Sequence, residues 1–240
     1  MTTPERGWTA VVLPLVLTLA CTFAVPLVGQ PFGALLVVLA VYLWRRWARR
    51  PWAGVGLGLT WSALPLFLVG VGVTVAVLVG ANAVSVALGA ARWVPWVPDD
   101  LAFLPVAVAI IVLVQALPEE LLWRGNLHDV LAERMPTGAV VAVTSVLFGA
   151  VHVFSQSQAQ GAWEVALYAV GAMALGLVCA AGRARTGTLW MAVGVHSGFY
   201  FANGFFPTEG IVYGVQLLVQ IVAMGLFGLV VLVMPRRGAA

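Results

Sequence analysis

Eight long apolar segments constrain the fold of this 240-residue chain more than any other feature of its sequence. They lie at approximately residues 8–28, 31–44, 61–90, 101–123, 138–154, 162–182, 188–204 and 211–234. A helix needs about 20 apolar residues to cross the hydrocarbon core of a bilayer, and most of these segments approach that length. Only 9% of the residues are charged, whereas soluble domains have about 25%. The sequence therefore predicts an all-α, polytopic membrane protein with about eight transmembrane helices.

The distribution of basic residues predicts the orientation of these helices. All twelve basic residues are arginines, and if the first helix starts in the cytoplasm, eleven of them lie on the cytoplasmic side, with Arg92 as the exception. This asymmetry follows the positive-inside rule and predicts that both termini are cytoplasmic. Because the loops are short, we expect a single helical membrane domain over residues 1–240, surrounded by the lipid bilayer of the cell membrane. The arginines form no continuous stripe, which argues against nucleic acid as a partner.

The segment Leu101–Pro118 is followed by two adjacent glutamates, Glu119 and Glu120, and then by Arg124. Charged groups next to lipid are costly to desolvate, so a carboxylate pair there points to a functional site. Glu120 and Arg124 are four residues apart, in the favourable order for an ion pair on a helix. Glu119 is rotated by about 100° from Glu120. We therefore expect one glutamate to be neutralised and the other to be free for chemistry. The simpler alternative is a pair of interfacial carboxylates at a helix end.

Two of the three histidines, His152 and His196, lie inside apolar segments. In an antiparallel hairpin that turns near residues 135 and 136, His152 and Glu119 are equally far from the turn and lie at one level. His196 follows the Arg183–Gly187 loop, on the same side, by about nine residues. All three groups are therefore expected at a similar depth of roughly 13 Å, at the rise of an α-helix. This convergence predicts an active site inside the helix bundle.

Other polar residues near the histidines have less specific interpretations. His128 lies in the polar stretch Asn126–Arg134, which is expected to extend beyond the membrane, and we interpret it as an interfacial residue. Tyr200 and Asn203 follow His196 by four and seven residues, on the same helix face. Both positions fit a role beside His196, and ordinary aromatic packing is the alternative for Tyr200.

The same residues form three ordered motifs. Glu119–Arg124 matches E-E-x-x-x-R, Phe148–His152 matches F-x-x-x-H, and Arg185–Trp190 followed by His196 looks like a third motif region. With these motifs the chain resembles the CPBP family, which contains type II CAAX prenyl proteases and Abi-like, bacteriocin-processing intramembrane endopeptidases. The resemblance covers a motif-bearing catalytic core of about residues 101–204. The family's third motif is commonly H-x-x-x-N, and in this chain Tyr200 occupies its last position.

The resemblance implies an eight-helix intramembrane endopeptidase whose cavity opens to the cytosol. In that interpretation Glu119 activates a water molecule with the help of His152. His196 stabilises the oxyanion together with Asn203 or Tyr200. The residues expected to support this geometry are Glu120, Arg124 and Phe148.

The resemblance leaves the metal dependence open, because the family has been described both as metalloproteases and as glutamate-dependent hydrolases without metal. Glu119, His152 and His196 have the ligand types for zinc and would leave a fourth position for water. The chain lacks the H-E-x-x-H spacing that would make such a site compelling. We therefore expect no cofactor, with zinc as the alternative.

Two other classes of membrane protein compete with an enzyme. A non-catalytic scaffold or immunity factor of the same fold is supported by Tyr200 at the third motif, and a proton-coupled transporter by glutamate and histidine inside the membrane. The lack of a strong internal repeat disfavours the transporter. As a substrate, a peptide, a lipidated tail or a membrane-embedded precursor fits the expected cavity equally well. The sequence determines neither the substrate nor the oligomeric state.

Overall fold

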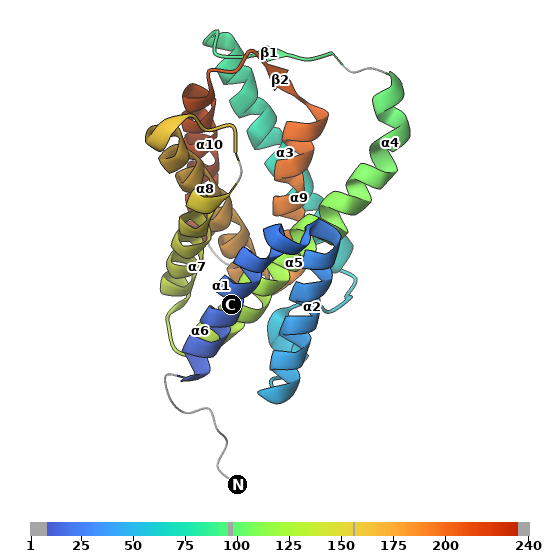
Figure 1. Cartoon of the computed structure of the whole chain (residues 1–240), viewed down its shortest axis with the longest axis vertical. Coiled ribbons are helices and arrows are strands. Elements are labelled where there is room, and N and C mark those ends of the chain that lie inside the picture. The colour runs from blue at the N-terminus through green and yellow to red at the C-terminus, as the bar shows by residue number, and fades with distance from the viewer. Residues whose placement is uncertain (1–8, 96–97, 156, 235–240) are drawn as a thin grey trace.

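The computed structural model describes residues 9–95, 98–155 and 157–234, and it confirms an all-α, polytopic architecture. Its described residues contain eight long helical segments, one for each segment expected from the sequence (Figure 1). Their bounds are α1 Thr9–Val28, α2 Gln30–Trp47, α3 Ala63–Ala87, a composite segment 98–132, α7 Thr137–Val151, α8 Gly161–Thr186, α9 Leu189–Phe205 and α10 Tyr213–Val233. Two short 3₁₀ turns, η1 Trp52–Val55 and η4 His152–Phe154, follow α2 and α7.

Six of the described helical segments are long and apolar enough to cross a membrane. The other two are α2, whose last turn contains Arg45 and Arg46, and α9, which has only 17 residues. Large apolar side chains are exposed on the outside of the bundle, among them Leu27 and Phe32 at 86% and 70% exposure. A surface of this kind is suited to lipid rather than to water, which agrees with a membrane protein.

The composite segment carries the two glutamates and is not a regular α-helix. Its consecutive parts are α4 Pro98–Ala109, the π-helical η2 Ile110–Ala116, α5 Leu117–Glu120, the π-helical η3 Leu121–Leu127 and α6 His128–Ala132. Pro118 has no N–H, and its ring would clash with the carbonyl four residues earlier, which is a local reason for the wider turns before it. Such π-helical distortions are frequent at functional sites. Glu119 and Glu120 thus lie in one short turn between two widened stretches.

Glycines bring α9, the helix of His196, into direct backbone contact with α3. A Cβ atom at Gly194 would collide with the carbonyl oxygen of Phe67, and one at Gly198 would lie 2.8 Å from that of Val71. Small residues let two helix backbones approach closely. The van der Waals packing that results is one of the forces that hold helices together in lipid. The position of His196 therefore depends on glycines one turn or less away from it.

Replacing Gly194 by Ala is expected to lower the free energy of unfolding by about 1–3 kcal/mol, because backbone atoms of α3 have to move. Thermal unfolding in detergent, followed by circular dichroism, measures the effect. Gly204→Ala is the matched control, since a Cβ there would meet nothing within 4 Å. The control should be neutral or slightly stabilising, because alanine is the better helix former. Equal unfolding temperatures for the two variants would contradict the close packing of α9 on α3.

A two-stranded antiparallel ribbon closes the end of the bundle opposite to α6 (Figure 1). It pairs β1 Arg92–Trp93 with β2 Thr208–Glu209, and Arg92 Nε donates to Glu209 Oε1 at 2.9 Å. Arg92 is the arginine that the sequence assigned to the non-cytoplasmic side. Arg50 and Arg134, assigned to the other side, lie at the α6 end. Arg92 thus lies at one end of the bundle, and Arg50 and Arg134 lie at the other, as the sequence-based orientation requires. Which end faces the cytoplasm stays a prediction.

Candidate functional site

Glu120, Arg124 and His196 form a buried cluster inside the bundle. Arg124 Nη1 donates to Glu120 Oε1 at 3.1 Å, and the same oxygen lies 2.8 Å from His196 Nδ1. The side chains of Glu120 and Arg124 are fully buried, and that of His196 is 2% exposed. Opposite charges in such a place compensate each other, because each would be very costly to bury alone. The ion pair expected from the sequence is confirmed, and the bond to His196 ties it to α9.

Arg124 also joins the composite helix to α7 and α8. Its Nη2 donates to the carbonyl oxygen of Gly176 at 3.0 Å, and its guanidinium carbon lies 4.4 Å from the ring centre of Phe148. A Cβ atom at Gly176 would lie 2.9 Å from Nη2, so the glycine makes room for this contact. A desolvated cation–π pair of this kind contributes about 2 kcal/mol. Phe148 is 1% exposed and packs against the Arg124 guanidinium.

Glu119 has different surroundings from Glu120. Its side chain is 32% exposed, and its Oε2 lies 3.6 Å from Nε2 of His196. This distance is longer than a hydrogen bond, so Oε2 makes only a loose contact with the imidazole and is not engaged in a direct hydrogen bond with it. Glu119 is thus the accessible carboxylate of the pair, and Glu120 the buried one.

Gln115 contacts Glu119, and the sequence-based site did not include it. Its Nε2 donates to Glu119 Oε1 at 3.1 Å, and its own Oε1 accepts a hydrogen bond from Gln30 of α2. This contact leaves Glu119 Oε2 directed at His196. A signal was present in the sequence, because Gln115 is a polar residue in an apolar segment and precedes Glu119 by four residues, on the same helix face.

His152 lies at the end of α7, where the chain changes from the α-helix to η4. Its Nδ1 lies 2.6 Å from the carbonyl oxygen of Phe148, which can only accept, so Nδ1 carries the proton and Nε2 is left for another partner. The Phe148 ring contacts both imidazoles, with its centre 4.6 Å from that of His152 and 6.1 Å from that of His196. The spacing of the F-x-x-x-H motif therefore fixes both the tautomer and the place of His152.

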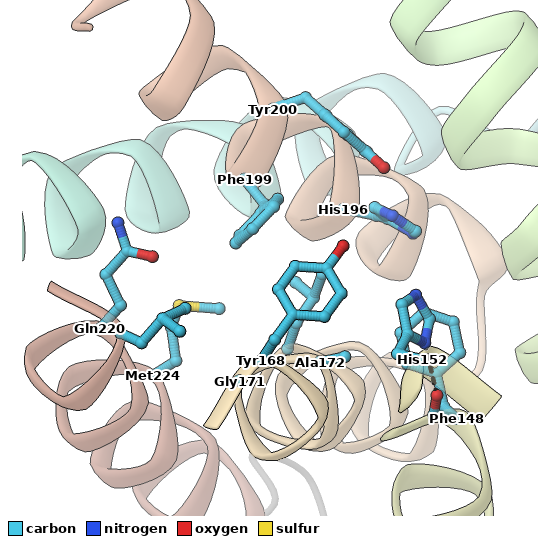
Figure 2. Close-up of a pocket in the computed structure, with 12 residues that line it drawn as sticks. Phe148, His152, Tyr168, Gly171, Ala172, His196, Phe199, Tyr200, Gln220 and Met224 are labelled. Carbon is cyan, nitrogen blue, oxygen red and sulfur yellow. Dashed lines mark hydrogen bonds between the residues drawn. The ribbon is translucent and has the colours of Figure 1, made fainter. Parts of the chain in front are cut away.

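A cavity of about 60 Å³ lies between α8, α9 and α10 and has both histidines in its wall (Figure 2). This volume is enough for a few water molecules. The polar side chains of its wall are His152, Tyr168, His196, Tyr200 and Gln220. The apolar part of the wall includes Phe148, Leu175, Phe199, Leu217 and Met224. Such an apolar cavity with a few polar groups at one end is typical of a binding site.

Of the two expected partners of His196, the structure brings Tyr200 to the imidazole and not Asn203. The Tyr200 ring is stacked on His196, with ring centres 5.5 Å apart and planes 12° apart. Asn203 Nδ2 instead donates to the carbonyl oxygen of Phe199 at 2.9 Å, and its Oδ1 accepts from Gln220 at 3.2 Å. The amide of Asn203 is therefore engaged one turn away from the imidazole.

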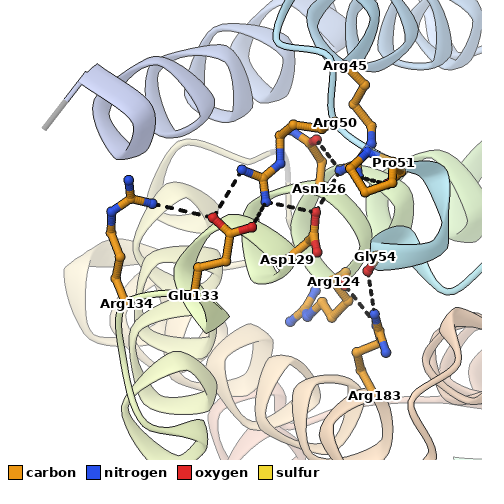
Figure 3. A network of polar contacts seen from close by, with 10 residues as sticks. All are labelled: Arg45, Arg50, Pro51, Gly54, Arg124, Asn126, Asp129, Glu133, Arg134 and Arg183. Carbon is orange, nitrogen blue, oxygen red and sulfur yellow. Dashed lines mark hydrogen bonds and ion pairs between the residues drawn. The ribbon is translucent and has the colours of Figure 1, made fainter. Parts of the chain in front are cut away.

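A network of ionic contacts lies behind the cluster, at the α6 end of the bundle (Figure 3). Arg45 of α2 donates to Asp129 at 3.0 Å and to Asn126 at 3.3 Å. Arg50, in the turn after α2, donates to Asp129 at 3.2 Å and to Glu133 at 2.6 Å. Burial lowers the pKa of Arg50, but its bonds to Glu133 and Asp129 outweigh burial and raise that pKa above the ordinary value. These contacts hold α2 against α6.

The stretch Asn126–Arg134 is buried in its first part and exposed in its last, and its expected projection beyond the membrane stays a prediction. Asn126 is fully buried and His128 is 7% exposed, because η1 and α2 cover this end of the composite helix. Arg183 of α8 also reaches this region, where it donates to the carbonyl oxygens of Arg124 and Gly54 at 3.2 and 2.7 Å. Only the later residues, such as Glu133 at 54% side-chain exposure, are open.

The described residues contain no group of three His, Cys, Asp or Glu side chains placed to hold a metal ion. His196 and His152 each have Nδ1 directed at an oxygen, of Glu120 and of the Phe148 carbonyl, an arrangement that leaves Nε2 open and is itself compatible with metal ligation. The alternative zinc set of Glu119, His152 and His196 has suitable ligand types, but these three side chains are not gathered around one point. We therefore derive no step through zinc.

Comparison with protein families identifies one match. Residues 101–202 match the sequence model of a family described as type II CAAX prenyl endopeptidase Rce1-like. The match includes Glu119, His152, His196 and Tyr200, and Asn203 lies just outside it. No curated protein matches the chain. The match indicates an enzyme of the protease type, and it confirms the resemblance drawn from the three motifs: the segment that carries the site is similar to the type II CAAX prenyl endopeptidases of the Rce1-like family.

Proposed function

We propose that the protein is an intramembrane endopeptidase that hydrolyses a peptide bond near the cytoplasmic side of the cell membrane. The observation that carries this proposal is the difference between the two adjacent carboxylates. Glu120 is fully buried and compensated by Arg124, whereas Glu119 is 32% exposed and lies beside a histidine of the cavity wall. An accessible carboxylate that is not paired with an arginine is the group that can accept a proton from water.

In this proposal Glu119 removes a proton from a water molecule while the water oxygen attacks the carbonyl carbon of the substrate. A C–O bond forms, and the carbonyl oxygen becomes an oxyanion. The C–N bond then breaks, and Glu119 returns the proton to the leaving amine. All atoms of the two products come from the substrate and the water molecule. Glu119 only carries one proton from the water to the leaving amine. His152, whose Nε2 is left open, is proposed to position the water.

His196 is proposed to stabilise the oxyanion. Both of its ring nitrogens face a carboxylate, Nδ1 at 2.8 Å from Glu120 and Nε2 at 3.6 Å from Glu119. An imidazolium donates from both nitrogens, so Nδ1 can hold Glu120 while Nε2, on the side of Glu119, donates to the oxyanion; a neutral ring donates from only one nitrogen. A donor of this kind, held in a buried site, contributes about 3–4 kcal/mol to transition-state stabilisation. The stacking of Tyr200 on this ring supports Tyr200 rather than Asn203 as the partner of His196.

The substrate is proposed to be a peptide or a membrane protein that reaches the cavity from the bilayer. The polar cluster lies inside a bundle whose outer surface is apolar, so a substrate has to leave water to reach it. Both termini are proposed to be cytoplasmic, following the distribution of the arginines.

A zinc chelator is expected to leave peptide cleavage unchanged, within about twofold, because no step depends on a metal ion. The measurement is cleavage of a fluorogenic peptide library by detergent-purified protein, with and without chelator. Glu119→Ala and His152→Ala are measured beside the wild type, and both are expected to abolish cleavage. Loss of wild-type cleavage on chelation, restored by added zinc, would contradict the metal-free mechanism. No cleavage by folded wild-type protein would favour the non-catalytic scaffold.

A further inference from the structure

Four side-chain amides and one hydroxyl connect α3, α9, α10 and β2. Gln220 Nε2 donates to Asn82 Oδ1 at 2.9 Å and to Asn203 Oδ1 at 3.2 Å. Gln216 Nε2 donates to the same Asn82 oxygen at 3.2 Å and to Thr208 Oγ1 at 2.8 Å. The proposed hydrolysis uses none of these groups. Asn82 and Gln216 are 1% and 7% exposed, so this network lies inside the bundle.

The orientation of each amide in this network is fixed by its neighbour. The carbonyl oxygen of Phe199 can only accept, so Asn203 has to direct its nitrogen at it, 2.9 Å away. The Asn203 oxygen is therefore directed at Gln220. Because this oxygen can only accept, the Gln220 nitrogen has to be the donor of the hydrogen bond between them. The second acceptor of that nitrogen, Asn82 Oδ1, favours the same orientation. One backbone carbonyl thus determines which end of the Gln220 amide is free.

The free end is Oε1, and Gln220 belongs to the cavity wall. In Figure 2 its oxygen points to the side of Phe199 and Met224, away from the nitrogen that serves the network. The surrounding wall is apolar at this end, with Phe199, Leu217 and Met224. Gln220 is therefore an acceptor of fixed orientation in an otherwise apolar part of the cavity that also contains His196.

We infer that Gln220 Oε1 accepts a hydrogen bond from a backbone N–H of the bound peptide and so helps to position it for cleavage. This inference rests on the proposed endopeptidase function and names the substrate contact that it requires. An extended peptide in a water-poor site has unpaired N–H groups, and each of them is costly to bury without an acceptor. Asn203 and Asn82 act through Gln220 as positioning residues. This positioning role explains why the Asn203 amide contacts Phe199 and Gln220 rather than His196, although Asn203 and His196 lie on the same face of α9.

A backbone-ester scan tests the inference. In each variant of a cleaved peptide, one non-scissile N–H is replaced by oxygen, which removes the donor with little change of shape. At one position, the wild-type protein is expected to lose at least about tenfold in kcat/KM. Gln220→Met is expected to cleave the parent peptide at about that lower rate and to show no further loss with the ester. Gln216→Met is the control: it changes the same network but does not line the cavity, and it should keep the position-specific loss.

Several outcomes would overturn the inference. The same position-specific loss in Gln220→Met as in the wild type would show that another group accepts the bond, and so would the absence of any sensitive position in a wild type that cleaves the parent peptide. If Gln220→Met does not fold, Gln220→Asn serves instead. It keeps an amide at this position but shortens the side chain by one methylene, and an undiminished ester effect in it would contradict the role of Gln220 Oε1. No cleavage of any peptide by the wild type would instead refute the proposed function itself, and this inference with it.

Discussion

Replacing Glu119 by Gln is expected to lower kcat/KM by about 10²–10⁴-fold, the usual contribution of a general base. The substitution keeps the shape of the side chain and removes its ability to accept a proton. Because Glu119 is 32% exposed and its described hydrogen bond is to Gln115, the free energy of unfolding should change by less than about 1 kcal/mol. Steady-state cleavage of a fluorogenic peptide and thermal unfolding of the same sample give the two numbers.

Glu209→Gln is the matched control for this substitution. Glu209 pairs with Arg92 in the exposed ribbon at the opposite end of the bundle, with its side chain 52% exposed, so activity should stay within about twofold of the wild type. A Glu119→Gln protein that retains more than a tenth of the wild-type activity would show that another group activates the water. A Glu119→Gln protein that loses stability in proportion to activity would make Glu119 a structural residue.

Arg124→Met is expected to have the opposite profile, with a loss of about 3–5 kcal/mol in the free energy of unfolding. The substitution leaves Glu120 fully buried without its cation and also removes the bond to Gly176 and the contact with Phe148. Breaking a buried ion pair from one side is costly, because the remaining charge is uncompensated. The unfolding temperature in detergent, measured by circular dichroism, should fall far below that of the wild type.

Two comparisons make this prediction specific. Arg92→Met breaks an ion pair whose side chains are 73% and 52% exposed, and it should cost no more than about 1 kcal/mol. The double variant Glu120→Gln/Arg124→Met removes both charges and should recover part of the lost stability. If Arg124→Met is no less stable than Arg92→Met, the buried pair does not hold this part of the bundle together.

Together, the two predictions assign different roles to the adjacent glutamates: Glu119 is needed for activity, and Glu120 for stability. The sequence alone predicted this difference only in part. The four-residue spacing of Glu120 and Arg124 was enough to predict their ion pair, because both lie on one helix and helical geometry is local. The bond between Glu120 and His196 was not predictable, since it depends on where α9 lies against the composite helix. That placement in turn depends on glycine contacts between α9 and α3.

The eight helical segments were predictable for a similar reason, because the hydrophobic lengths needed to cross a bilayer are read directly from the chain. The two π-helical stretches around Glu119 and Glu120 were not, since Pro118 indicates a distortion but not its form. Asn203 illustrates the limit of helix-face arguments. It shares a face with His196, but its amide is bound to the Phe199 carbonyl one turn earlier and to Gln220, and the bond to Gln220 depends on the position of α10.

Gln115 and Gln220 differ in how far the sequence indicates their contacts. Each is an uncharged polar residue inside an apolar segment, where an unsatisfied amide is expensive, so each needs a partner on the protein. Gln115 precedes Glu119 by one helical turn, so the contact between them could be predicted from their spacing along the chain. The partners of Gln220 come from α3 and α9, and no spacing along the chain indicates them.

The measurement that tests the central claim most directly is a single turnover of a cleaved peptide by excess wild-type protein in water enriched in ¹⁸O. If Glu119 activates a water molecule, one solvent ¹⁸O atom enters the new carboxyl group of the product in the first turnover, and no ¹⁸O enters the protein. If a carboxylate of the protein attacks the substrate itself, and water then opens the resulting anhydride at the carboxyl carbon of the protein, the first product carries ¹⁶O and the ¹⁸O appears in that carboxylate. That second result, or no cleavage by folded protein, would contradict the role of Glu119 as the base that activates water.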